Sequence, residues 1–335
     1  MHDPRGVRYP TTEGAARGTT ETGKRILDAA LGAVRTDAAE AARVALAGER
    51  QWRHAYQSHF EAVACTMAGD GTLAMARAGL AEAAKSFEFC GADGSVVKIR
   101  DIVAPDAAAP PASATIHTAI VEGSQHGFAP TIIDVPFSGR LHGGRELCHL
   151  VKTWVDAGQA HASFAASIAE AVAHPEWFDL RGKVFVLIGA TSEMGPLEPL
   201  LACGATVVAL ARGNSRSKPE KWQRVIAKAR ASPGRLVVPL SAPRDASVGD
   251  DASGDDALAA LAGADATAQT DAIIQWLAGD EIAAFLGAGD ALHIYSGIYL
   301  PGKHFVRATV AMDAIVAGCV FLSICFVSVV LFRLL

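Results

Sequence analysis

Two glycines, Gly189 and Gly195, bracket a short polar loop with the composition of a phosphate-binding turn. The loop between them reads ATSEM and contains Thr191 and Ser192. A serine in such a loop can cap the helix that follows and donate a hydrogen bond to a phosphate oxygen. These residues at this spacing therefore predict binding of a phosphorylated ligand.

A basic residue, Arg212, follows the next apolar run of the same stretch, Thr206–Leu210. In dinucleotide-binding units this position meets the adenosine ribose. An acidic residue there suits the 2′-hydroxyl of NAD, whereas a basic residue suits the 2′-phosphate of NADP. With Arg216 and Lys218 close behind it, Arg212 predicts NADP, with NAD as the other possible cofactor.

The elements that position this loop can be read from the apolar runs around it. Val184–Ile188 predicts a strand, Pro196–Cys203 a helix and Thr206–Leu210 a second strand. A strand, a glycine-edged turn, a helix and a strand form the opening half of a dinucleotide-binding unit. Further helices and strands alternate along the chain, which favours a parallel sheet with helices on both faces. They are predicted at 220–231, 235–240, 270–277 and 292–300.

The segment Gly189-Ala-Thr-Ser-Glu-Met-Gly195 resembles the GATGxxG loop of the short-chain and extended dehydrogenase/reductase superfamily. The resemblance covers about a hundred residues, and the loop is its specific part. It implies an NAD(P)-dependent oxidoreductase acting on a small-molecule substrate. It also implies that Gly189, Thr191, Ser192, Gly195 and Arg212 bind the cofactor. The wider string EMGPLEPLLACGATVVA is similar to uncharacterised bacterial Rossmann-type proteins, which implies the fold alone.

Three residues depart from the superfamily pattern. Ser192 stands where the family has a glycine that lets the backbone approach the diphosphate, Glu193 adds a carboxylate there, and Pro196 removes a backbone N–H. They favour the alternative of a non-catalytic Rossmann-like interaction or scaffold module tethered to a membrane. A methyltransferase that uses S-adenosylmethionine would also begin with a strand and a glycine loop. Its loop carries an acidic residue before the first glycine, where this chain has Ile188.

Tyr299 and Lys303 stand in the Tyr-x-x-x-Lys spacing of the catalytic pair of the same superfamily. There the lysine lowers the tyrosine pKa and the tyrosine donates a proton to the carbonyl. Pro301 and Gly302 lie between the two residues and disfavour a helix. The alternative is a β-turn that carries both side chains on the surface, with Tyr295 as another candidate acid.

The N-terminal part predicts a flexible tail at 1–20 and a helical region at 21–95. Its helices are expected at 24–34, at 37–48 after an Asp37/Glu40 capping box, at 52–67 and at 73–89. A Rossmann-like domain is expected at 96–312, with its nucleotide unit at 182–242. Strands are predicted at 96–103, 115–121 and 131–135, and helices at 145–157 and 163–173. The expected fold class is thus α/β, a Rossmann-like doubly wound parallel sheet with a helical N-terminal region.

Three polar or proline-rich segments interrupt this pattern. Residues 104–114 predict a linker, and the acidic stretch 244–256 predicts a flexible insertion. The glycine-rich segment SGRLHGG at 138–144 is interpreted as a loop. Its alternative is a loop at the start of a helix whose Arg140 and Arg145 face an anionic ligand.

The C-terminal run Ala314–Phe332 contains no charged residue. Its 19 residues span about 28 Å as a helix, close to the hydrocarbon thickness of a bilayer. The segment 313–335 therefore predicts a transmembrane helix, a single-pass anchor to a membrane. Lys303 and Arg307 favour a cytoplasmic location for the soluble part. The alternative is a buried terminal helix followed by a strand.

Composition sets the remaining limits. Half of the residues are hydrophobic, 19% are charged and the formal net charge is -5, so no nucleic acid partner is expected. The N-terminus has no apolar segment of a signal peptide. The six cysteines form no CxxC pair, and the eleven histidines are scattered. We therefore expect reduced buried thiols and no metal site.

Overall fold

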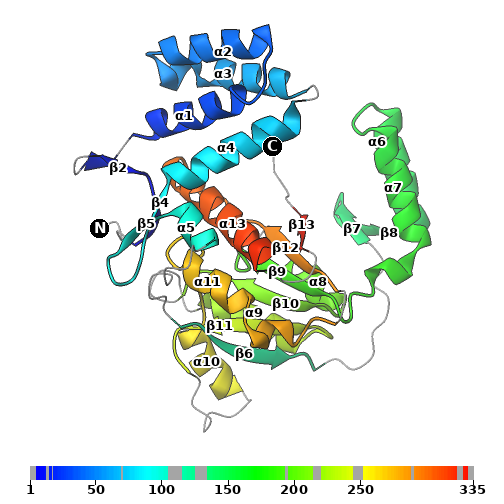
Figure 1. Cartoon of the computed structure of the whole chain (residues 1–335). Coiled ribbons are helices and arrows are strands. Elements are labelled where there is room, and N and C mark those ends of the chain that lie inside the picture. Colours follow the sequence, from blue (N-terminus) through cyan, green and yellow to red (C-terminus); the bar gives the residue numbers. More distant parts are fainter. Residues whose placement is uncertain are drawn as a thin grey trace. The chain divides into compact units, whose positions relative to one another are not determined.

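The structure is a computed structural model and describes residues 5–12, 15–16, 18–68, 71–104, 115–124, 134–192, 195–213, 220–243, 252–287, 290–322 and 327–330. The described residues form two compact units, and most of their elements are labelled in Figure 1. Unit 1 contains those of Met1–Ile116, Asp265–Gly279 and Ile298–Ile324. Unit 2 contains those of His117–Ala264, Asp280–Gly297 and Cys325–Leu335.

Unit 2 is built on a six-stranded sheet with the order β13-β12-β9-β10-β11-β6. Its strands are β6 (His117–Glu122), β9 (Val184–Ile188), β10 (Thr206–Leu210), β11 (Arg235–Leu240), β12 (Leu292–Ser296) and β13 (Val327–Val330). All pairs are parallel except β11 with β6. The sheet is therefore mixed, and the expectation of a purely parallel sheet is wrong at this edge. The connection from β6 to β9 carries two hairpins, so β6 is free to pair in the opposite direction as an edge strand.

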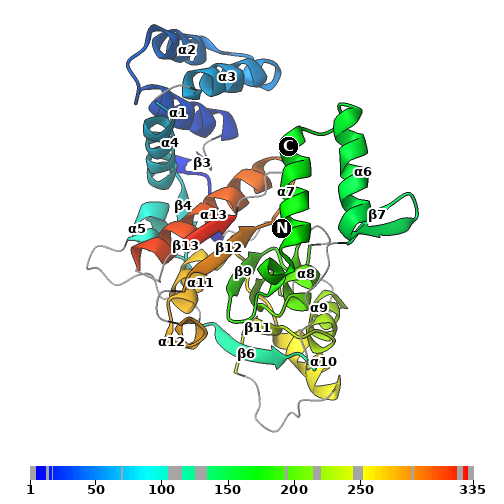
Figure 2. The same cartoon turned by 90° about the vertical axis from the view of Figure 1, so that its right-hand side faces the viewer.

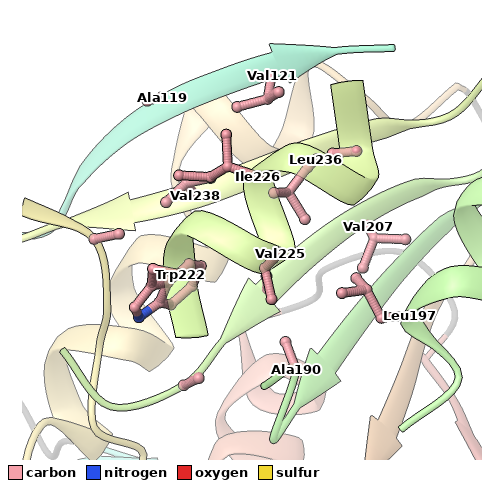
Figure 3. Close-up of a cluster of buried hydrophobic side chains, with 14 of the residues drawn as sticks. Ala119, Val121, Ala190, Leu197, Val207, Trp222, Val225, Ile226, Leu236 and Val238 are labelled. Atoms are coloured by element: carbon pink, nitrogen blue, oxygen red, sulfur yellow. The ribbon is translucent and has the colours of Figure 1, made fainter. Parts of the chain in front are cut away.

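The centre of the sheet is the most buried part of unit 2. All five residues of β10 are buried, as expected for a strand covered on both faces. One face of the sheet is covered by the helices α8 (Leu197–Ala202), α9 (Glu220–Arg230) and α10 (Ala252–Leu261). Figure 3 shows Trp222, Val225 and Ile226 of α9 against the strand residues Val207, Leu236 and Val238. Burial of these apolar side chains fixes α8 and α9 above the sheet.

Two hairpins lie between β6 and β9. The strands β7 (Asp134–Phe137) and β8 (Arg140–Gly143) form the first one, with its turn at Ser138 and Gly139. Helices α6 (Gly144–Asp156) and α7 (Ala162–Ala173) form the second one and lie side by side (Figure 2). A short 3₁₀ helix, η1 (Pro175–Phe178), follows. The segment predicted as a glycine-rich loop is thus mostly the strand β8, since its residues 140–143 pair with β7.

Unit 1 contains the N-terminal helices and a small sheet. Its elements are β1 (Gly6–Arg8), β2 (Thr11–Thr12), β3 (Ala15–Ala16), α1 (Thr19–Leu31), α2 (Asp37–Gly48), α3 (Trp52–Met67), α4 (Thr72–Ser86), β4 (Glu88–Cys90), β5 (Val96–Lys98), α5 (Ile99–Val103), α11 (Thr270–Leu277) and α13 (Lys303–Phe321). β1, β4 and β5 form an antiparallel sheet. The helix α2 is capped by Thr36, whose side chain accepts from the backbone N–H of Ala39, and not by Asp37 as the sequence suggested.

Further boundaries differ from the sequence expectations. Residues 88–89, predicted at the end of a helix, belong to β4, and residues 99–103, predicted as strand, form α5. Residues 252–256, predicted within a flexible insertion, begin α10. In each case packing within the fold outweighs the local residue preference. The predicted linker, except for Ala104, and residues 244–251 lie outside the described part of the chain.

The C-terminal run does not form one helix over 314–332. α13 ends at Phe321, and β13 pairs in parallel with β12. Among the described residues, α13 is the helix that is long and apolar enough to cross a membrane, although 44% of its most apolar window is buried. Val310, Ala311 and Ala314 of α13 pack in the core of unit 1 with side chains of β1, β4 and α5. The C-terminal run therefore has the helix-and-strand form of the alternative interpretation.

Candidate functional site

The glycine loop lies at the carboxyl end of β9, at the centre of the sheet of unit 2. Gly189 has φ 98°, a conformation that glycine adopts without strain, so the predicted tight turn is present. Its backbone N–H and that of Ala190 both donate to the carbonyl of Leu210, at 2.8 and 3.1 Å. These two bonds hold the start of the loop against the end of β10.

The rest of the loop forms its own hydrogen bonds. The N–H of Ser192 donates to the carbonyl of Gly189 at 2.8 Å, and the N–H of Gly195 donates to the carbonyl of Ser192 at 3.1 Å. The helix α8 that follows has only six residues, and its N-cap is Pro196. A short helix has a weak dipole, and Pro196 has no N–H to donate. Backbone donors therefore contribute less to an anion site here than in a standard dinucleotide loop.

A cavity of about 390 Å³ opens beside the loop, between α8 and α9. Its lining residues are Ala190, Thr191, Ser192, Gly195, Leu197, Glu198, Lys221, Arg224, Val225 and Lys228. Its volume falls in the range of about 300–1,000 Å³ typical of small-molecule pockets. The structure thus brings the predicted residues Thr191, Ser192 and Gly195 together around one cavity.

Three cations of α9 give this cavity its charge. Lys221, Arg224 and Lys228 stand at i, i+3 and i+7, so they share one face of the helix. The buried face of the same helix, with Trp222 and Ile226, is fixed in the core. The cations were not singled out from the sequence. Their helical spacing directly after the second strand of the nucleotide unit was the signal that could have identified them.

One carboxylate faces the same cavity. Glu198 of α8 forms an ion pair with Lys228. Its side chain is 64% exposed and that of Lys228 is 38% exposed, so the pair contributes little to stability. With three cations and one carboxylate, the described lining carries a net charge of +2. Glu193 and Met194 of the loop, like Arg216 and Lys218, lie outside the described residues.

Arg212 is exposed and is not among the residues that line the cavity. Two hydrogen bonds and one close approach of two backbone segments hold the chain around Arg212. The indole N–H of Trp222 donates to its carbonyl at 3.0 Å. The neighbouring Ala211 carbonyl accepts from Ala264 at 2.8 Å, and a Cβ on Gly263 would come within 2.4 Å of the Cα of Gly213. Residues 211–213 therefore have a fixed path, which carries the Arg212 side chain on the surface of unit 2.

The predicted catalytic pair belongs to the other unit. Tyr299 and Lys303 lie in unit 1, whereas the glycine loop lies in unit 2. Tyr299 precedes α13, is 83% exposed and contacts Phe305 at 5.9 Å between ring centroids. Lys303 is the first residue of α13, and Gly302 before it has φ 56°. The two residues therefore do not share a helical turn.

Three further candidates have the following positions. Tyr295, on β12 of unit 2, packs against the apolar core of the sheet. Arg140 lies on β8, and its guanidinium is 3.7 Å from the carboxylate of Glu146. Arg145 lies near the start of α6. Within the described part of the chain, no group of three or more His, Cys, Asp or Glu side chains could hold a metal ion.

Comparison of the chain with protein-family models, with curated proteins and with solved structures found no match.

Proposed function

We propose that unit 2 is a Rossmann-like module that binds a nicotinamide dinucleotide, NADP or NAD. The order of its parallel strands carries the proposal. In chain order the first strand, β9, lies at the centre, with β10 and β11 on one side and β12 and β13 on the other. This is the order 3-2-1-4-5 of dinucleotide-binding sheets, in which the ligand lies outside the carboxyl ends of the strands at the point where the order reverses.

The residues at that reversal point agree with the proposal. The reversal lies between β9 and β12, where Ser296 pairs with Ile188 and the N–H of Gly297 donates to the carbonyl of Ile188 at 2.9 Å. Gly189 follows directly on β9. Gly189 lets the backbone turn tightly at the end of β9, where the phosphates of a dinucleotide would lie. At Gly297 the Tyr295 ring occupies the space next to the backbone, 2.5 Å from the position of a Cβ. Gly189, Thr191, Ser192, Gly195 and Arg212 are the residues proposed to hold the cofactor.

The activity that follows is an oxidoreductase acting on a small-molecule substrate, with the hydride carried by the nicotinamide. No residue is assigned the proton transfer, because Tyr299 and Lys303 do not share a helical turn. Titration of the full chain with NADPH and with NADH, followed by calorimetry, tests the proposal. Saturable binding of either cofactor supports the proposal, and the absence of binding of both cofactors at millimolar concentration would refute it. The full chain is needed because a truncation at 312 would cut through α13.

A second candidate is a non-catalytic module that acts by binding another protein. The internal hydrogen bonds of the Ser192 and Gly195 amides and the six-residue α8 favour it. Substitution of Gly189 by Val, which strains the turn, separates the two. In the cofactor proposal this variant loses NADPH binding while its circular dichroism stays native. In the scaffold proposal neither the native protein nor the Gly189→Val variant binds the cofactor.

The proposal for localisation is a single-pass attachment to a membrane through the C-terminal segment, with the rest of the chain in the cytoplasm. It is supported by the uncharged run after Asp313 and by the exposed apolar side chains Val320, Phe321 and Leu322 at the end of α13. The buried face of α13 and the pairing of β13 favour a core role instead. Alkaline carbonate extraction separates the two: an anchored protein stays in the membrane fraction, and a core helix leaves it in the supernatant.

A further inference from the structure

We propose that the cavity between α8 and α9 binds a phosphomonoester group of a small-molecule ligand through the side chains of Lys221 and Arg224. The inference deepens the proposed nucleotide binding and rests on it for the ligand class. It assigns the anion to side chains of α9, and not to backbone amides at the start of α8.

The charge of the described lining favours an anion, although Lys221 and Arg224 are both exposed to solvent. Lys221, Arg224 and Lys228 converge from one face of α9, and Glu198 neutralises one of them. Within the described part of the chain, Lys221 and Arg224 form no ion pair. Two cations facing one cavity without a carboxylate partner repel each other, and a dianion relieves this repulsion. A phosphomonoester carries a charge of about -1.5 to -2 at neutral pH.

The donor groups and the size of the cavity also fit a phosphate ester better than a free inorganic phosphate ion. A guanidinium can give two parallel hydrogen bonds to phosphate oxygens, and an ammonium adds a point charge. Thr191, in the loop after β9, adds a hydroxyl donor. The cavity of about 390 Å³ leaves room for the organic part of the ligand. Its polar donors thus come from the loop and from α9, and Leu197 and Val225 add apolar side chains to the lining.

Glu198 makes the charge of the cavity adjustable. The Glu198 carboxylate competes with a ligand phosphate for Lys228, and its negative charge repels that phosphate. Replacing Glu198 by Gln removes the repulsion and releases Lys228, so phosphate binding should become stronger. A gain of affinity is informative, because a damaged fold would only lose it.

The test measures binding of inorganic phosphate, 2′-AMP, 5′-AMP and adenosine to the full chain by calorimetry. We expect the three phosphate compounds to bind and adenosine to bind more weakly, with affinities that fall as salt is raised. Preference for 2′-AMP would assign the group to the adenosine 2′ position, and preference for 5′-AMP to a terminal phosphate. Lys221→Gln and Arg224→Gln should each weaken binding roughly tenfold.

Two matched variants serve as controls. Lys152→Gln removes an exposed lysine of α6 that is paired with Asp156, outside the cavity. Glu122→Gln removes a carboxylate that is 60% exposed and paired with Arg235, as a match for Glu198. We expect neither to change phosphate affinity, whereas Glu198→Gln should raise it about fivefold.

The outcomes separate this inference from the proposed function. Binding of NADPH that is unchanged in Lys221→Gln and Arg224→Gln would overturn the inference and leave the cofactor proposal standing. Binding of 2′-AMP or 5′-AMP that depends on Lys221, without binding of NADPH or NADH, would support the inference and sink the cofactor proposal. Two further results would overturn the inference about the cavity. One is equal phosphate affinity of the Glu198→Gln and Glu122→Gln variants. The other is the absence of saturable phosphate binding at millimolar concentration.

Discussion

The buried carboxylate Glu88 pairs with two cations of unit 1, and its removal should loosen the sheet β1-β4-β5. Its side chain is 8% exposed. It accepts hydrogen bonds from Arg8 at 3.1 and 3.2 Å, from Lys98 at 3.0 Å and from Thr11 at 3.1 Å. Arg8 and Lys98 stand opposite Glu88 on the two neighbouring strands. The carboxylate therefore links all three strands of the sheet.

The cost of replacing Glu88 by Gln can be worked out from these contacts. Breaking a buried ion pair costs about 3–5 kcal/mol when an uncompensated charge stays buried. Here Arg8 and Lys98 are 27% and 38% exposed, so water stabilises them after the change and reduces the cost. The amide still accepts a hydrogen bond from one side. We expect a loss of about 2 kcal/mol, which corresponds to about a thirtyfold decrease in local protection.

Hydrogen exchange followed by mass spectrometry measures this change in peptides that cover β4 and β5. Peptides from β9 and β10 of unit 2 provide an internal reference. The matched control is Asp28→Asn, which breaks an exposed ion pair with Arg43 and should cost less than about 1 kcal/mol. Equal protection of the sheet in Glu88→Gln and Asp28→Asn would refute the reasoning, because the buried carboxylate would then contribute no more than a surface one.

Three further changes have predictable outcomes. Burial alone would raise the pKa of Glu88, but hydrogen bonds and the nearby cation Lys98 lower it below its ordinary value of 4.5. The stabilisation that the Glu88 carboxylate gives is therefore complete above about pH 4.5 and is lost as the pH falls through the lower pKa of the folded protein. Hydrogen exchange corrected for intrinsic rates should show this loss in the native protein and not in Glu88→Gln. Gly263→Ala places a Cβ 2.4 Å from the Cα of Gly213 and should cost more than 2 kcal/mol in chemical unfolding. Gly182→Ala, at a glycine that also has a positive φ but no atom within 4 Å of the added Cβ, should cost about 1 kcal/mol. Equal costs would mean that the close approach does not matter. Thr36→Ala removes the cap of α2 and should lower the stability of unit 1 by about 1 kcal/mol, with Thr36→Ser close to the native value.

The sequence predicted the central strands and their helices well because local patterns specify them. The runs 184–188, 206–210 and 235–240 are strands with these same bounds, and 52–67 is a helix with these same bounds. Each is a continuous apolar or amphipathic run with clear ends. The direction of β6 could not be predicted, since it depends on pairing with β11, more than a hundred residues away.

The charge of the candidate site could be predicted only in part. The glycine loop is local, and Thr191, Ser192 and Gly195 do line a cavity. Lys221, Arg224 and Lys228 join it because the core contacts of Trp222 and Ile226 set the rotation of α9. Such a rotation depends on packing across the sheet and not on the cations themselves. The end of α13 at Phe321 and the strand β13 likewise depend on pairing with β12.

The central claim is that a nicotinamide dinucleotide binds at the carboxyl end of β9. Hydrogen exchange of the full chain with and without saturating NADPH tests it most directly, because it reports both binding and its place. We predict slower exchange in peptides covering the loop after Ile188 and the chain after Leu210, and no change in α1 to α4. Unchanged exchange at the loop, or protection confined to unit 1, would contradict it.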